Sequence, residues 1–122
     1  MDKGGGQVRG YKMLINGHWV DSSTGERFSS VNPYDQEVWA YIPQASGQDV
    51  HDAISAARYT FDNLWKKLSG LKRAELMYKL ANLLDENAER ISQLETTDNG
   101  KVIRETKKQI RFASRQYRFF AG

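Results

Sequence analysis

Apolar residues between Lys72 and Leu94 recur at steps of three and four, the spacing that forms one face of an α-helix. The members of this stripe are Leu76, Met77, Leu80, Leu83, Leu84, Ala88, Ile91 and Leu94. Most residues between them are polar or favour helices. Asn99 and Gly100 then supply two residues that tolerate positive φ, as the end of a helix requires. The pattern predicts one long helix over about 70–97 whose apolar stripe needs a partner surface.

A shorter amphipathic segment lies on each side of this stripe. The first predicts a helix over about 47–66, which Ser46 can cap and in whose first turn Asp49 is favoured. The second predicts a helix over about 102–120. Its expected inward positions are Ile103, Thr106, Ile110, Ala113, Tyr117 and Phe120.

The residues before the first helix have the pattern of short strands and turns. Asn16-Gly17 lies between two apolar runs, which is the strongest short-range hairpin signal because both central residues of a type I′ turn need positive φ. A later strand is expected to stop at Asn32-Pro33, since the residue before a proline favours extended geometry. We therefore predict an antiparallel β unit over about 12–43, after a flexible glycine-rich leader over 1–11. The glycines of that leader do not match the dinucleotide fingerprint. The expected fold class is α+β.

Length and composition restrict the function classes. The chain has 122 residues, which suits one modest domain or a piece of a larger one. It has no cysteine, so it holds no disulfide, thiolate metal site or cysteine nucleophile. No apolar run has the length of a membrane span. We expect a cytoplasmic protein with no membrane partner.

The positive charge is concentrated at one end. Residues 101–122 contain seven Lys/Arg and one acid, a balance of +6, and the other residues have eleven bases and fourteen acids, a balance of −3. A basic helix can bind nucleic acid, but no aromatic and basic recognition motif accompanies it, so we expect no nucleic-acid partner. A solvated helix face is the favoured interpretation. A basic nucleic-acid-binding domain and a free-standing helical protein-interaction module remain the alternative functions.

Six landmarks follow one another along the chain. They are Ile15-Asn16-Gly17-His18-Trp19-Val20, Val31-Asn32-Pro33-Tyr34-Asp35-Gln36-Glu37-Val38, Ala56-Ala57-Arg58-Tyr59-Thr60-Phe61, Leu83-Leu84-Asp85-Glu86-Asn87-Ala88-Glu89, Leu94-Glu95-Thr96-Thr97-Asp98-Asn99-Gly100-Lys101 and Tyr117-Arg118-Phe119-Phe120-Ala121-Gly122. In order and spacing, this set resembles the N-terminal quarter of the aldehyde dehydrogenase superfamily. The resemblance covers about residues 14–122.

The resemblance implies an α/β parent enzyme that oxidises an aldehyde to a carboxylic acid with NAD or NADP. In that family a cysteine thiolate attacks the aldehyde, hydride passes to the nicotinamide, and a glutamate-activated water hydrolyses the thioester. An oxyanion hole stabilises the charge. All of these groups lie, in the family, beyond the part that this sequence matches.

Residues 12–122 are therefore expected to be the N-terminal part of a cofactor-binding domain, cut after Gly122. We expect this segment to be scaffold, inactive alone and without NAD or NADP bound. Its expected partners are the remainder of its own polypeptide, an aldehyde substrate and, in the parent, further copies in a homo-oligomer.

The resemblance also implies a monovalent cation site. Its positions on this chain are Ser30, the carbonyl of Val31, and Asp98, which are all oxygen donors as a hard cation requires. Ser30 stands where the family often has threonine, and it keeps the hydroxyl. The alternative is that Asp98 caps or bonds a nearby turn.

Overall fold

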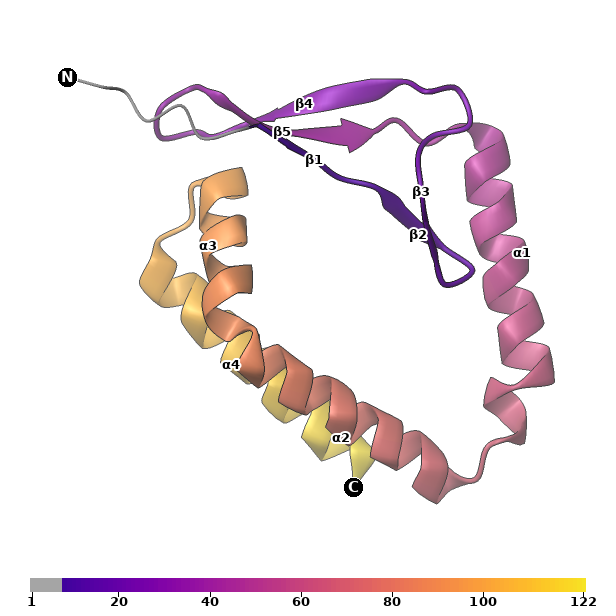
Figure 1. The fold of residues 1–122 in the computed structure, drawn as a ribbon. Coiled ribbons are helices and arrows are strands. Elements are labelled where there is room, and N and C mark those ends of the chain that lie inside the picture. The colour runs from indigo at the N-terminus through magenta and orange to yellow at the C-terminus, as the bar shows by residue number, and fades with distance from the viewer. Residues whose placement is uncertain (1–7) are drawn as a thin grey trace. The chain divides into compact units, whose positions relative to one another are not determined.

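The computed structural model describes residues 8–122, which form two compact units (Figure 1). The first unit ends at Asn63 and contains the strands and one helix. The second unit begins at Leu64 and is entirely helical. Strands followed by helices confirm the expected α+β class.

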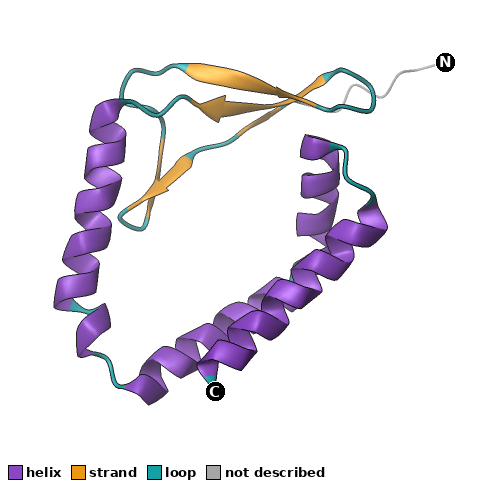
Figure 2. Ribbon diagram, turned by 180° about the vertical axis from the view of Figure 1, so that it is seen from behind, coloured by secondary structure: helices purple, strands orange, loops and turns teal. Residues whose placement is uncertain are grey.

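Two small sheets form the β part of the first unit (Figure 2). Strands β2 (Met13–Ile15) and β3 (His18–Val20) pair antiparallel, and the turn between them has φ of 50° at Asn16 and 77° at Gly17. Both values are positive, as a type I′ turn requires, which confirms the hairpin prediction. The second sheet has the order β1-β5-β4, with β1 at Arg9–Gly10, β4 at Arg27–Val31 and β5 at Val38–Pro43.

Strand β1 differs from the sequence-based expectation in two ways. It lies within the segment expected to be a flexible leader, and it pairs parallel with β5 rather than antiparallel. Residues 1–7 of that leader lie outside the described residues. The β unit is thus mixed, because the backbone groups of residues 9–10 pair with a strand about thirty positions later, which no local pattern reveals.

Helix α1 spans Gly47–Asn63 and begins with a reciprocal cap. The Ser46 hydroxyl accepts from the Asp49 N–H at 3.1 Å, and the Asp49 carboxylate accepts from the Ser46 N–H at 2.8 Å. This is the geometry of a capping box with aspartate in place of glutamate.

The second unit starts with a 3-10 helix, η1 (Trp65–Lys67), followed by α2 (Gly70–Glu86), α3 (Ala88–Asn99) and α4 (Ile103–Ala121). The prediction of one helix over 70–97 was wrong, because the helical backbone is interrupted at Asn87. The backbone N–H and the side-chain amide of Asn87 both donate to the Leu83 carbonyl, at 3.1 and 2.9 Å. Asparagine side chains compete for backbone partners in this way and favour helix ends.

Small side chains fill the interior of the described residues. The buried apolar residues are three alanines (Ala40, Ala81 and Ala88) and Pro43, and the buried polar residues are Ser22, Asp49, Ser92, Thr106 and Ser114. Large side chains of the predicted stripe, such as Leu80 and Leu83, are 40% and 46% exposed.

Three inward positions predicted on α4 were wrong. Ile103, Tyr117 and Phe120 are exposed. Thr106 is buried as predicted, and Ser114, which was not predicted, is buried as well. The small side chains permit close approach of the helices, whereas the large ones project beyond the contact. Among residues 8–122, no helix combines the length and apolar character that membrane spanning requires.

Candidate functional site

Two of the three predicted cation ligands are neighbours at the end of β4. The strand pairing shifts between Ser30 and Val31, which marks an irregularity of the ladder. The Ser30 hydroxyl accepts a hydrogen bond from the Trp39 indole N–H at 3.0 Å, which orients the serine oxygen.

The turn that follows β4 is held by its own side chains. The Asn32 amide oxygen accepts from the Tyr34 N–H at 3.0 Å, and an Asp35 carboxylate oxygen accepts from the Glu37 N–H at 3.0 Å. Gln36 adopts a φ of 62°. These local bonds fix the course of the chain directly after the Val31 carbonyl.

The third predicted ligand, Asp98, lies in the last turn of α3 and belongs to the second unit. Ser30 and Val31 are consecutive residues of the first unit. In the turn after α3, the Gly100 N–H donates to the Thr96 carbonyl, and the Asn99 side chain accepts from the Lys101 N–H. Within the described residues, no three His, Cys, Asp or Glu side chains gather as a metal site.

A polar network joins α2 to α4. The Ser114 hydroxyl donates to Asp85 at 2.6 Å, and the Arg118 guanidinium contacts Ser114 at 2.9 Å, Asp85 at 2.7 Å and the Asn82 amide oxygen at 2.8 Å. The Ser114 hydrogen bond, followed by Arg118, lowers the pKa of Asp85. The network fixes the register of α4 on α2, since a carboxylate with two donors is a directional contact.

Further polar contacts join α3 to α4. The Lys107 ammonium lies 2.8 Å from the Glu89 carboxylate, and its hydrogen bond lowers the pKa of Glu89. The Thr96 and Thr106 hydroxyls lie 3.2 Å apart. The basic face of α4 is thus solvated only in part, because Lys107 and Arg118 bind carboxylates on neighbouring helices.

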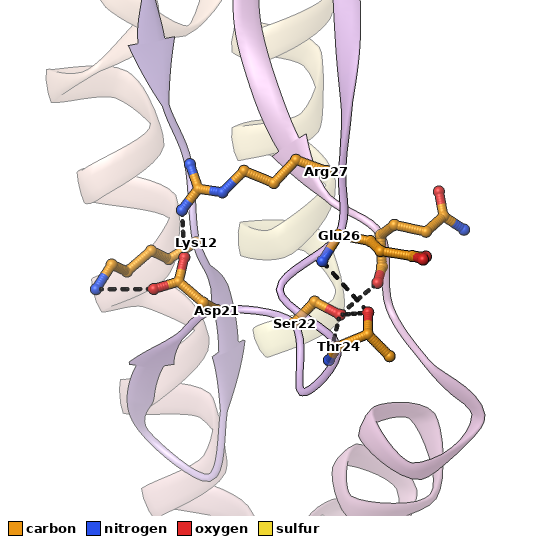
Figure 3. A network of polar contacts seen from close by, with 7 residues as sticks. Lys12, Asp21, Ser22, Thr24, Glu26 and Arg27 are labelled. Atoms are coloured by element: carbon orange, nitrogen blue, oxygen red, sulfur yellow. Dashed lines mark hydrogen bonds and ion pairs between the residues drawn. The ribbon is translucent and has the colours of Figure 1, made fainter.

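A third polar cluster stabilises the turn at residues 21–26, directly before β4 (Figure 3). Asp21 forms ion pairs with Lys12 and Arg27. Next to it, the Ser22 hydroxyl donates to the Gln44 carbonyl at 2.6 Å and lies 3.0 Å from the Thr24 hydroxyl.

Asp49 ties this turn to α1. Its carboxylate accepts from the Ser23 N–H at 3.2 Å and from the Ser22 hydroxyl at 3.3 Å, in addition to the Ser46 N–H. The backbone hydrogen bond from Ser46 is the main cause that lowers the pKa of Asp49 from 3.8 to about 2. One side chain thus joins the start of α1 to a turn more than twenty residues earlier.

We expect the hydrogen bonds between Asp49 and the turn at residues 22–23 to weaken in acid. A carboxyl group whose pKa is lowered by folding stabilises the fold fully above its unfolded pKa, and loses that contribution as the pH falls. The contribution of Asp49 should therefore be complete above about pH 4 and disappear towards pH 2. Hydrogen-exchange protection factors at the Ser23 and Ser46 amides, which correct for the intrinsic pH dependence of exchange, should fall across this range.

The control compares two aspartates of α1. Asp49→Asn should remove this acid dependence, because an amide does not titrate. Asp52→Asn should preserve it, because Asp52 accepts from the exposed Gln48 side chain and not from the turn. An unchanged acid dependence in Asp49→Asn would contradict the assignment.

The chemistry of these clusters is structural. The resolved pKa shifts of Asp49, Asp85 and Glu89 are all downward, which keeps each carboxylate ionised at neutral pH and unsuited to donate a proton. Sequence reasoning identified the Ser46 and Asp49 cap but missed the bond from Asp49 to the earlier turn. It also missed Ser114, whose only local signal is its position four residues before Arg118, on the same side of the helix.

The chain matches the model of the "Aldehyde dehydrogenase family" over residues 19–122. It is 42% identical, over 113 residues, to (Z)-2-((N-methylformamido)methylene)-5-hydroxybutyrolactone dehydrogenase of Acinetobacter baylyi, covering 92% of this chain and 23% of that protein. The crystal structure of an NAD-dependent aldehyde dehydrogenase from Sinorhizobium meliloti superposes with a TM-score of 0.90 at 34% identity, covering 94% of this chain and 23% of that one. The NAD+ complex of an aldehyde dehydrogenase from Bacillus cereus gives a TM-score of 0.87 at 37% identity, covering 92% and 23%. The chain therefore spans about a quarter of the length of these relatives.

Proposed function

This chain belongs to the aldehyde dehydrogenase family, and we propose that it is the N-terminal segment of an NAD(P)-dependent enzyme that oxidises an aldehyde to a carboxylic acid. The match over residues 19–122 carries the proposal. The nicotinamide cofactor, when bound to the parent, accepts the hydride from the substrate. This chain has no cysteine, so the nucleophile comes from another part of the parent.

The role of the segment is support for the catalytic part. Its helices contact one another through small buried side chains, and they leave large apolar side chains half exposed. Such faces suit packing against further protein, here the remainder of the same polypeptide. The parent is proposed to be a cytoplasmic homo-oligomer, and the absence of cysteine agrees with a reducing compartment.

The cation site is part of the same proposal. Ser30 and the Val31 carbonyl would supply two oxygen donors from β4, and Asp98 would supply a carboxylate from α3. The chemistry of these donors fits a hard monovalent cation, since all three are oxygens and one carries a negative charge.

A chimeric enzyme tests the function. The segment of the Acinetobacter baylyi dehydrogenase that aligns with this chain would be replaced by residues 8–122, and NAD-dependent activity measured on the substrate of that enzyme. We expect the chimera to fold and to keep activity, while the 122-residue chain alone turns over no aldehyde. Activity of the chain alone, or a chimera that folds with native spectra and is inactive, would refute the proposal.

A matched pair of variants makes the chimera more informative. Ser114→Asp places a second carboxylate beside Asp85 and should separate α4 from α2, whereas Arg115→Asp introduces an aspartate on the exposed side of the same helix. We expect the first variant to lose soluble enzyme and the second to retain it. Equal yields would show that the contact between α2 and α4 does not support the enzyme.

A further inference from the structure

The chain contains two Asn-Gly pairs that differ in their hydrogen bonding. Asn16-Gly17 forms the tip of the β2-β3 hairpin, and Asn99-Gly100 ends α3. Their chemistry is the same in an unfolded chain. An asparagine followed by glycine can cyclise, because the glycine N–H has no neighbouring side chain to hinder its approach to the asparagine amide carbon.

The pair at the end of α3 is held in a way that opposes this reaction. The Gly100 N–H donates to the Thr96 carbonyl at 2.9 Å, so the nitrogen that would attack is already bound. The Asn99 amide oxygen accepts from the Lys101 N–H at 2.9 Å, so the side chain is turned towards the following residue. Both bonds must break before Gly100 nitrogen can reach the Asn99 side chain.

The pair at the hairpin tip has no such restraint. Asn16 and Gly17 are exposed, and nothing lies within 4 Å of the point where a Cβ on Gly17 would project. Within residues 8–122, no protein group accepts a hydrogen bond from the Gly17 N–H or forms one with the Asn16 side-chain amide. The attacking and the attacked group are therefore both accessible to solvent.

We propose that Asn16 is a site of spontaneous deamidation in the folded chain and that Asn99 is protected. The Gly17 nitrogen loses its proton to base and bonds to the Asn16 Cγ. The Cγ–Nδ2 bond then breaks and ammonia leaves, which gives a five-membered succinimide. Water adds to one of the two ring carbonyls and breaks its bond to nitrogen, which yields aspartate or isoaspartate.

The isoaspartate product changes the hairpin, because it routes the main chain through Cβ and adds one backbone atom to the turn. The pairing of Ile15 with His18 directly beside the turn depends on a two-residue connection. A longer connection disturbs that register, and with it the exposed cross-strand pair of Leu14 and Trp19. Aspartate at position 16 preserves the register, since aspartate tolerates the same turn.

Peptide mapping by mass spectrometry tests the proposal. The chimeric enzyme that carries residues 8–122 would be incubated at mildly alkaline pH in heavy-oxygen water, under conditions where circular dichroism retains its native signal. We expect label and isoaspartate to accumulate at position 16 at least about tenfold faster than at position 99, because reaction at 99 requires local opening of the helix end. In urea the two rates should become similar.

Two variants show which asparagine gives rise to each product. Asn16→Gln should abolish the product at 16 and leave the slow rate at 99 unchanged, since a glutamine would have to form a six-membered ring. Asn99→Gln should leave the rate at 16 unchanged. Equal rates at 16 and 99 in the folded chain, or a faster rate at 99, would overturn the proposal.

Discussion

The 122-residue chain alone should self-associate in water and show no sharp, reversible unfolding transition as a monomer. Its helices expose large apolar side chains that no part of the described structure covers. Prominent examples are Ile54 at 64%, Leu71 at 74% and Phe119 at 74% exposure. Extensive exposure of large apolar side chains marks a protein interface or an aggregation site.

The size of the effect follows from the area left in contact with water. Burial of apolar surface stabilises by about 25 cal/mol per Å². If several hundred Å² of apolar surface stays uncovered, the folded chain lacks on the order of 10 kcal/mol of stabilising free energy. That amount is comparable with the whole stability of an ordinary domain. The buried alanines, serines and threonine of this chain do not replace that amount, because each buries little apolar area.

Sedimentation velocity over a range of concentrations, together with thermal melts, measures this behaviour. We expect broad or oligomeric species and a concentration-dependent melt. Replacing Leu80 and Leu83 by glutamine should reduce association, whereas Lys79→Gln on the same helix should leave it unchanged. A monodisperse monomer with a cooperative, reversible transition would contradict the idea that this segment needs a covering partner.

Ala81→Leu should destabilise the second unit by about 1–3 kcal/mol, because inserting methylene groups into a filled interior forces side chains or backbone to shift. Ala81 is fully buried on α2 and lies one helical turn before Asp85, which contacts α4 through Ser114 and Arg118. A leucine at 81 would therefore push α4 outwards and stretch the contacts of Asp85.

The urea midpoint of the chimeric enzyme is the suitable measurement, since the chain alone is expected to associate. Lys79→Leu serves as the control, because it adds a leucine at an exposed position two residues away. We expect a lower midpoint for Ala81→Leu and little change for Lys79→Leu. Equal midpoints would show that the small residue at 81 is not required for the approach of α4.

Local signals of the sequence predicted a large share of the secondary structure. Asn16-Gly17 identified the hairpin, and Gly100 marked a helix end where the structure has a φ of 75°. Ser46 and Asp49 identified the start of α1. Each of these features depends on residues within four positions of one another, so a local reading is sufficient.

The errors came from contacts between distant residues and from burial. The parallel pairing of Arg9 with Ala40 has no local signature. Hydrophobic spacing predicted Tyr117 as inward, whereas Ser114 occupies the buried position because it bonds to Asp85, twenty-nine residues earlier. The break at Asn87 carried a signal, an asparagine within a helix, which the continuous apolar stripe obscured.

In the candidate cation site, too, some features could be read from the sequence and others depend on contacts between distant residues. Oxygen donors at Ser30, Val31 and Asp98 could be named from the sequence by resemblance, and the structure places Ser30 and Val31 side by side on β4. The hydrogen bond from Trp39 that orients the Ser30 hydroxyl depends on the pairing of β4 with β5. The contribution of Trp39 could not be found from spacing alone.

The sequence by itself determined the α+β class, the hairpin, the cap of α1 and the end of α3, because turn and cap preferences act between near neighbours. Its lack of cysteine also decided that no thiol chemistry takes place within these residues. Only the tertiary structure decided which side chains are buried and which carboxylates hold the helices in register. Those outcomes depend on how closely two backbones approach, and the helices of this chain approach where their side chains are small rather than where they are most apolar.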